Sequence, residues 1–144
     1  RAPMTSPIGE RYHRAVRFQL PITATDADID ELDHVSNLVY LRWVLEAATA
    51  HSAAKGWGHP EYRRLGSVFI VRRHELDYLA PVLRGEHVIA ETWVASWKGA
   101  SCVRATEIKR GEQVVLRAAT TWAFVSLTSG RPQRIPEELL AAFA

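Results

Sequence analysis

The stretch that decides the fold is Asp28-Ile29-Asp30-Glu31-Leu32-Asp33-His34-Val35-Ser36-Asn37-Leu38-Val39-Tyr40. It places several acidic residues, one histidine and one asparagine directly ahead of a long, apolar, alanine-rich helix pattern. Ser36 is a good N-cap, Lys55 suits the last turn, and Gly56 suits the position just past the end. The sequence therefore predicts one helix over residues 36–55, apolar around most of its circumference.

Strand patterns lie on both sides of this helix. Residues 13–22 alternate in part and predict a first strand, and Pro21 indicates that this strand lies near an edge of the sheet or ends there. A loop is expected over residues 58–66. Four β-rich runs follow, joined by short turns that require antiparallel pairing: 67–80, 86–97, 100–110 and 113–126. A short helix is expected from Pro136.

This order of elements predicts an α+β fold in which a five-stranded antiparallel sheet wraps around one long central helix. We expect residues 11–144 to form a single domain and residues 1–10 a flexible N-terminal segment. One helix cannot cover five long strands completely, so a homodimer or homotetramer is expected.

Composition narrows the function classes. The chain has 144 residues, of which 47% are hydrophobic and 24% charged, as is typical of a globular domain. No apolar run is long enough to span a membrane. The net charge of +2 is too small to favour nucleic acid as a partner. The single cysteine, Cys102, excludes an intrachain disulfide and favours a reducing, cytoplasmic compartment.

The acidic loop partly fits the patterns of several chemistries. Asp26, Asp28 and Asp30 fit the first positions of a calcium-binding EF-hand loop, but the glycine and the final glutamate are replaced by Glu31 and Asn37. His34 has no second histidine or cysteine at metal-ligand spacing, so neither a metal nor another cofactor is predicted. A serine hydrolase elbow is absent from the sequence, and a lone cysteine in a strand is typical of packing.

The chemistry that remains for the acidic loop is that of a carboxylate acting next to a helix N-terminus. The first turn of a helix has unpaired N–H groups and partial positive charge, which can stabilise an oxyanion on an acyl carbonyl. A nearby aspartate can attack that carbonyl or deprotonate a water molecule. Thioesters suit this arrangement because a thiolate leaves with little acid assistance.

The motif resembles the 4-hydroxybenzoyl-CoA thioesterase-like branch of the hot-dog fold, with a close variant in plant-type acyl-ACP thioesterases. The matching residues are Asp28, Asp30, His34, Val35, Asn37 and Tyr40, and the likeness extends to segments 76–86 and 117–125. The resemblance implies that Asp30 is the catalytic aspartate and that the backbone of Asn37 contacts the thioester carbonyl. It also implies a site role for His34 and substrate contacts for Ser36 and Tyr40.

The sequence departs from the family pattern at three positions. Ser36 replaces an asparagine, Asp33 replaces the usual glycine or glutamine, and Leu32 stands where the acyl-ACP variant has a second site asparagine. An aspartate-centred hydrolysis of an acyl-CoA is therefore the primary hypothesis. An acyl-ACP thioesterase and a non-catalytic acyl-binding protein are the alternatives.

Other polar and aromatic residues are assigned ordinary roles. Glu46 is expected to pair with Arg42 at i, i+4. Basic side chains that can bind the phosphates of CoA are not distinguished by sequence from surface charges; they are Arg72, Arg73, Lys98, Lys109 and Arg110. The strand tryptophans Trp93, Trp97 and Trp122 are expected to pack in the core or at an interface.

Overall fold

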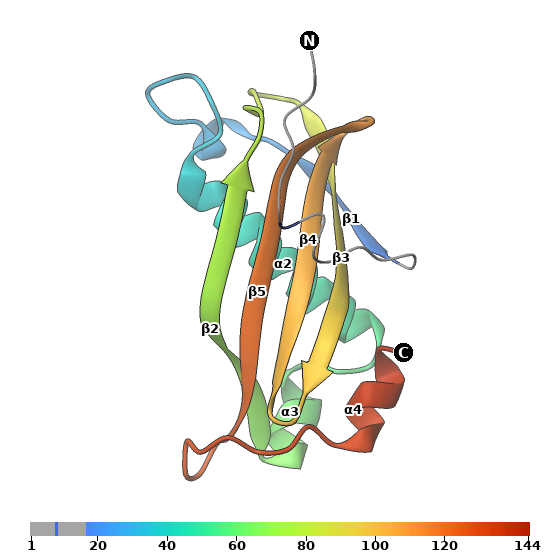
Figure 1. Cartoon of the computed structure of the whole chain (residues 1–144). Helices are drawn as coiled ribbons and strands as arrows, with labels where there is room; N and C mark the ends of the chain where they lie inside the picture. The colour runs from blue at the N-terminus through green and yellow to red at the C-terminus, as the bar shows by residue number, and fades with distance from the viewer. Residues whose placement is uncertain (1–7, 9–16) are drawn as a thin grey trace.

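The computed structural model describes Ile8 and residues 17–144. The flexible segment predicted for residues 1–10 lies outside the described residues except for Ile8, and so does the first part of the strand predicted at 13–22. The described elements follow in chain order (Figure 1): β1 Phe18–Thr23, the 3-10 turn η1 Asp26–Asp28, α2 Asn37–Ala54, α3 His59–Leu65, β2 Ser67–Tyr78, β3 His87–Lys98, β4 Ser101–Arg110, β5 Gln113–Ser126 and α4 Glu137–Ala142.

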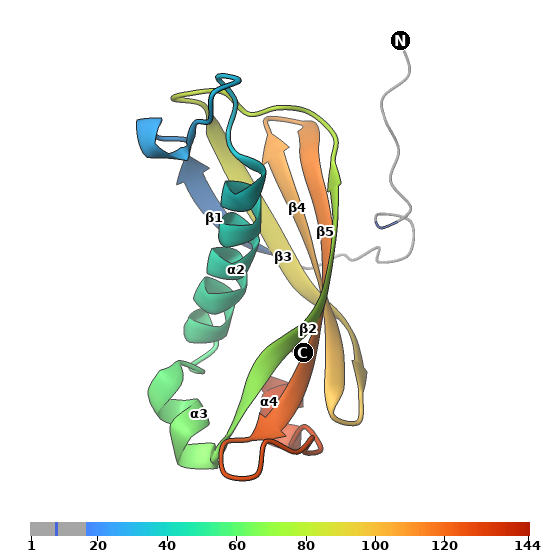
Figure 2. The same cartoon turned by 90° about the vertical axis from the view of Figure 1, so that its left-hand side faces the viewer.

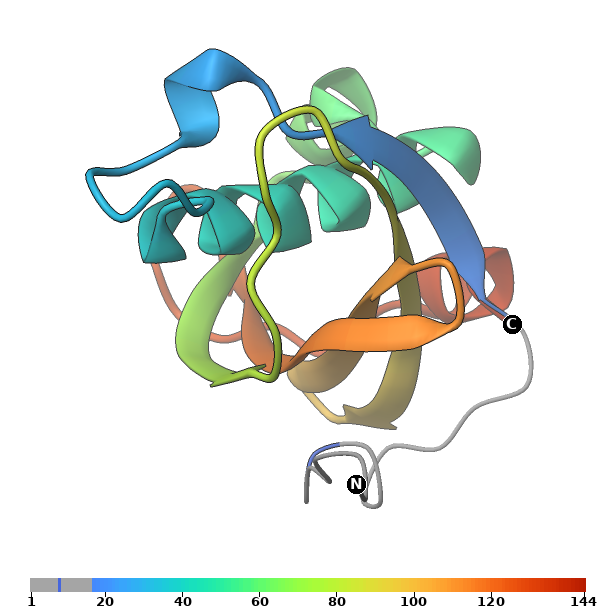
Figure 3. The same ribbon diagram turned by 90° about the horizontal axis from the view of Figure 1, so that it is seen from above.

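The strands form one antiparallel sheet in the order β1-β3-β4-β5-β2. Strands β3, β4 and β5 form a meander, while α2 connects the two edge strands β1 and β2. Figure 2 shows α2 against one face of the twisted sheet, and Figure 3 shows the sheet curling around the helix from above. The predicted α+β fold, with its five-stranded antiparallel sheet around one long helix, is confirmed.

Helix α2 begins and ends where its sequence signals indicate. Ser36 is the N-cap and accepts a hydrogen bond from Leu38 N, while Gly56 follows the C-cap with a φ of 87°. The helix residues buried against the sheet include Tyr40, Trp43, Val44 and Ala47. Burial of each large apolar side chain stabilises the folded state by roughly 1.5–3 kcal/mol. The polar residues Arg42, Glu46 and Thr49, which follow one another at helical spacing, are exposed. The helix is thus fixed to the sheet by one face.

The loop prediction for residues 58–66 is wrong, because these residues contain helix α3. Its N-cap Gly58 donates its N–H to Glu61 Oε1 over 2.8 Å, and Pro60 lies in the first turn. Gly66 ends the helix with a φ of 80°, the left-handed conformation that suits glycine. The start and stop signals were present, but only seven residues separate them, too few for a periodic pattern to be recognised.

The edge position predicted from Pro21 is confirmed. Pro21 lies within β1, which pairs only with β3 among the described strands, so its missing N–H costs no bond in the sheet.

The molecule has two distinct ends. The segment between β1 and α2 lies at one end of the sheet, and α3 and α4 lie at the other (Figures 1 and 2). A second apolar cluster fills the α3–α4 end around Trp57, Phe124, Ile135 and Leu139. Among the described residues, no helix is both long and apolar enough to cross a membrane.

Candidate functional site

The acidic stretch forms a tight turn just ahead of α2. Ile29 and Val35 form a β-bridge, Asp30 N donates to His34 O over 2.8 Å, and Asp33 N donates to Asp30 O over 3.1 Å. Asp33 has a φ of 61°, the left-handed conformation found at the third position of three-residue hairpin loops. This positive φ suits glycine, which is one of the two residues expected at this position from the motif.

Asp28 anchors the turn to the helix. The residue is 4% exposed, and its carboxylate accepts hydrogen bonds from the N–H and hydroxyl of Thr25 and pairs with Arg42 Nη2 at 2.7 Å. Burial by itself raises the pKa of Asp28, but the hydrogen bonds from Thr25 and Arg42 outweigh it and leave the pKa below its usual value. All of these contacts hold the fold, so Asp28 has a structural role.

Asp30 lies two residues further on, at the first position of the turn. Asp30 is partly exposed, and its Oδ1 accepts a hydrogen bond from Leu32 N over 2.9 Å. Its other carboxylate oxygen, Oδ2, has no hydrogen-bond donor among residues 17–144.

The start of α2 lies beside this turn, because Ser36 N donates to Asp28 O over 2.9 Å. In the first helical turn, Leu38 N is capped by Ser36 Oγ and Val39 N by Ser36 O. The N–H of Asn37 has no acceptor within the described part of the chain. The side chains of His34 and Asn37 are both exposed. An accessible carboxylate and an open helix N-terminus are therefore neighbours along one short segment.

Tyr40 lies beneath the turn instead of facing solvent. Its side chain is 3% exposed, and its hydroxyl accepts a hydrogen bond from Val82 N over 2.9 Å. Val82 O in turn accepts from Val35 N over 2.9 Å, so the β2–β3 connection is tied to both the turn and the helix. Burial is the main reason that the pKa of Tyr40 is raised.

Tyr78, a residue that sequence reasoning did not single out, is brought by the fold to the helix start. Its hydroxyl donates to Asn37 O over 3.2 Å, and its ring contacts Tyr40 edge-on at 5.5 Å between centroids. Only the position of Tyr78 at the end of a predicted strand was available as a signal, and it does not reveal which helix end the strand approaches.

Several charged side chains have partners elsewhere in the chain. The predicted pair between Arg42 and Glu46 is confirmed at 3.2 Å. Lys109 pairs with Glu91 at 3.0 Å, and Arg110 pairs with Glu86 at 2.8 Å, so both are engaged within the fold. Over the described residues, no cluster of three or more His, Cys, Asp or Glu side chains is arranged to hold a metal ion.

Comparison with known proteins identifies the superfamily to which the chain belongs. Residues 24–143 match the model of the thioesterase-like superfamily, so the chain belongs to that superfamily. No curated protein matches the chain by sequence.

Solved structures agree in fold at low sequence identity. A 1,4-dihydroxy-2-naphthoyl-CoA thioesterase from Synechocystis has a TM-score of 0.81 at 18% identity and covers 89% of this chain and 96% of its own. A DHNA-CoA thioesterase from Staphylococcus aureus has a TM-score of 0.80 at 18% identity, covering 88% of each chain. A hypothetical protein from Staphylococcus aureus, solved in complex with CoA, has a TM-score of 0.83 at 12% identity and covers 88% of this chain and 81% of its own. The fold is therefore the hot-dog fold of acyl-CoA thioesterases.

Proposed function

We propose that this protein hydrolyses an acyl-CoA thioester to the free acid and CoA. The observation that carries the proposal is the position of Asp30. Its turn is bonded to the backbone immediately ahead of α2, where the N–H of Asn37 has no acceptor among the described residues. Membership of the thioesterase-like superfamily and the thioesterases of the same fold support this reaction class.

In the proposed mechanism, Asp30 acts on the thioester carbonyl as general base or nucleophile. As a base, it takes a proton from water while the water oxygen bonds to the carbonyl carbon. As a nucleophile, its carboxylate attacks directly and water then hydrolyses the mixed anhydride. In both routes the N–H of Asn37 donates to the developing oxyanion, and the C–S bond breaks to release the CoA thiolate.

The remaining predicted site residues have supporting parts in this proposal. His34 is exposed at the end of the turn, and we assign it to contacting the thioester beside Asp30. Ser36 shapes the helix start as its N-cap. We assign Tyr40 to holding the loop beneath the substrate, because its hydroxyl is already bonded to Val82. Asn37 acts through its backbone, so Asn37→Ala should change kcat/KM less than threefold.

The proposal has two alternatives, of which one differs in the carrier of the acyl group and the other in the absence of catalysis. An acyl-ACP thioesterase uses the same chemistry on a protein-bound acyl group, and matched acyl-CoA and acyl-ACP substrates separate the two by their kcat/KM. A non-catalytic acyl-binding protein predicts saturable binding of acyl-CoA without release of thiol. The complex of a same-fold protein with CoA favours CoA as the carrier.

We also infer that the protein is a homo-oligomer. Strand β2 is twelve residues long and lies at an edge of the sheet, where unpaired backbone groups can bond a second copy. Leu32 and Leu38 are 70% and 77% exposed near the Asp30 turn, and burying such side chains in an interface is favourable. A cytoplasmic location, inferred from the single cysteine, stays a prediction.

The test is the pair of variants Asp30→Asn and Asp33→Asn. Asn keeps the acceptor for Leu32 N at position 30 and tolerates the positive φ at position 33, so both variants should fold. Thiol release from benzoyl-CoA and from fatty acyl-CoAs is followed colorimetrically. We expect Asp30→Asn to lose at least about 100-fold in kcat, and Asp33→Asn to stay within threefold of wild type. If Asp30→Asn retains full thiol release, Asp30 is not the catalytic residue.

A further inference from the structure

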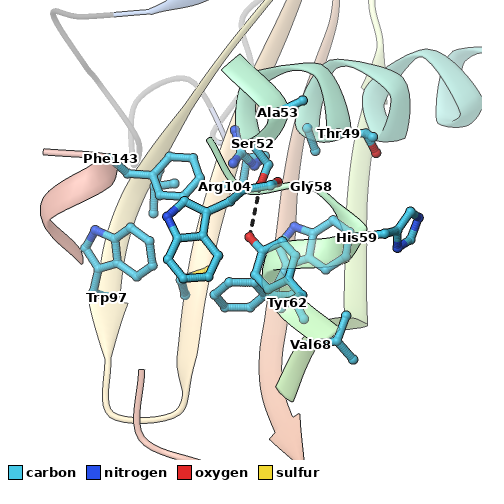
Figure 4. Close-up of a pocket in the computed structure, with 16 residues that line it drawn as sticks. Thr49, Ser52, Ala53, Gly58, His59, Tyr62, Val68, Trp97, Arg104 and Phe143 are labelled. Atoms are coloured by element: carbon cyan, nitrogen blue, oxygen red, sulfur yellow. Dashed lines mark hydrogen bonds between the residues drawn. The ribbon is translucent and has the colours of Figure 1, made fainter. Parts of the chain in front are cut away.

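A cavity of about 390 Å³ lies at the opposite end of α2 from the Asp30 turn, between α2, α3, α4 and the sheet (Figure 4). Aromatic rings form most of its wall: Trp57, Tyr62, Phe69, Trp97, Trp122 and Phe143. Thr49, Ala53 and His59 line it from exposed positions and mark its mouth. At 1.5 Å per residue, the helix separates Thr49 from Asn37 by about 18 Å. Within one chain this cavity is therefore separate from the proposed catalytic turn.

Arg104 brings a positive charge into this apolar cavity. The residue is only 6% exposed, and its Nη1 donates to His51 Nδ1 over 2.8 Å and to Thr92 Oγ1 over 3.2 Å. No carboxylate of the described residues forms an ion pair with it. Burial lowers the pKa of Arg104 to about 10, so the guanidinium is still charged at neutral pH. A buried charge without a counter-ion is unfavourable, and an anion in the cavity would offset that cost.

His51 is a neutral hydrogen-bond acceptor for Arg104 and not a counter-ion. Burial, aided by Arg104 and Lys55, lowers the pKa of His51 to about 4, so its ring is neutral at pH 7 and Nδ1 accepts the hydrogen bond from Arg104. The Arg104 Nε and Nη2 groups have no acceptor among residues 17–144 and remain available as donors.

A second donor on the cavity wall also lacks a partner. The indole Nε1 of Trp122 is buried and has no hydrogen-bond acceptor in the described structure. Tyr62 differs in this respect. Ser52 Oγ donates its single hydrogen to Trp57 O over 2.7 Å, so the Tyr62 hydroxyl donates to Ser52 Oγ over 2.9 Å (Figure 4). Arg104, through Nε and Nη2, and Trp122, through Nε1, therefore carry donors without an acceptor among the described residues.

The chemistry of the wall selects among anions. Arg104 is the only lysine or arginine among the lining residues, which favours a singly charged group over a phosphate dianion. The planar guanidinium fork matches a carboxylate. The aromatic rings suit an apolar body attached to that carboxylate. Cys102 also lines the cavity, but burial raises the pKa of its thiol to about 11, so it is not a ready nucleophile and the cavity is suited to binding.

We propose that this cavity binds an amphipathic monocarboxylate, with the carboxylate on Arg104 and Trp122 and the apolar body between the aromatic rings. Binding at this site does not require that the protein hydrolyse thioesters, so the proposal stands apart from the function inferred above.

The test compares acids with their neutral amides. 4-Phenylbutyrate, octanoate and the two corresponding amides are titrated into the full chain at pH 7.5, followed by calorimetry and by fluorescence of the cavity tryptophans. The wild type should bind each acid at least tenfold more tightly than its amide. Arg104→Met should bind acid and amide equally, with the amide affinity within threefold of wild type. Arg63→Met, at an exposed position on α3, should behave as wild type.

The proposal is overturned if the wild type binds neither acid, if it does not prefer acid over amide, or if Arg104→Met keeps the preference. Should Arg104→Met fail to fold by circular dichroism, Trp122→Phe provides the second test, because it removes the unpartnered N–H and keeps an aromatic ring. It should weaken acid binding three- to tenfold and leave amide binding unchanged. An equal loss for both ligands would instead assign Trp122 to packing alone.

Discussion

The hydroxyl of Tyr40 joins the β2–β3 connection to the start of α2, so Tyr40→Phe should lower the free energy of unfolding. Tyr40 is 3% exposed and Val82 is 0% exposed, and Val82 N donates to the hydroxyl over 2.9 Å. In the variant this buried N–H loses its acceptor, at a cost of about 1–3 kcal/mol. For a chain of this length the corresponding fall in Tm is roughly 3–10 °C.

Urea unfolding followed by far-UV circular dichroism measures this change. Tyr78→Phe is the matched control, since its hydroxyl donates to Asn37 O at a site that is 45% exposed. The control should lose less than about 0.5 kcal/mol. If Tyr40→Phe unfolds at the wild-type urea midpoint while its KM rises tenfold, Tyr40 contacts the substrate and does not hold the loop.

Two further predictions concern the outer face of the sheet and its edge. Glu91 is buried, but hydrogen bonds from Arg17, Lys109 and Gln19 outweigh that burial and lower its pKa from 4.5 to about 2. Because the pKa of Glu91 is lower in the folded than in the unfolded state, its carboxylate stabilises the fold above pH 4.5, and this stabilisation is lost as the pH falls towards 2. Glu91→Gln should therefore lower the free energy of unfolding by on the order of 2 kcal/mol at pH 7. The variant should also lose less stability than the wild type as the pH falls from 4.5 towards 2. An unchanged acid limb in the variant would argue against this ion network. Light scattering should give at least twice the chain mass of 16.2 kDa, and a monomer at micromolar concentration would contradict assembly through the β2 edge.

The candidate site was only partly accessible from sequence. The motif singled out Asp30 and the helix start, whereas the bonds of Asp28 to Thr25 and Arg42 were visible only in the fold. The sequence did not reveal that the hydroxyl of Tyr40 is bonded within the fold. Nor did it mark Arg104, which is one arginine among dispersed basic residues until the sheet buries it.

The sequence by itself determined the helix and the four long strands, because caps, turns and apolar periodicity act over a few residues. It also placed the acidic loop directly ahead of the helix, and the hydrogen bonds made by Asp30 itself span four residues or fewer. Tertiary structure alone decided what surrounds these elements. Tyr40 meets Val82 across 42 positions and Arg104 meets His51 across 53, contacts set by how the sheet curls around α2. Burial, which makes the Tyr40 bond structural and leaves Arg104 without a counter-ion, arises only when distant segments pack together.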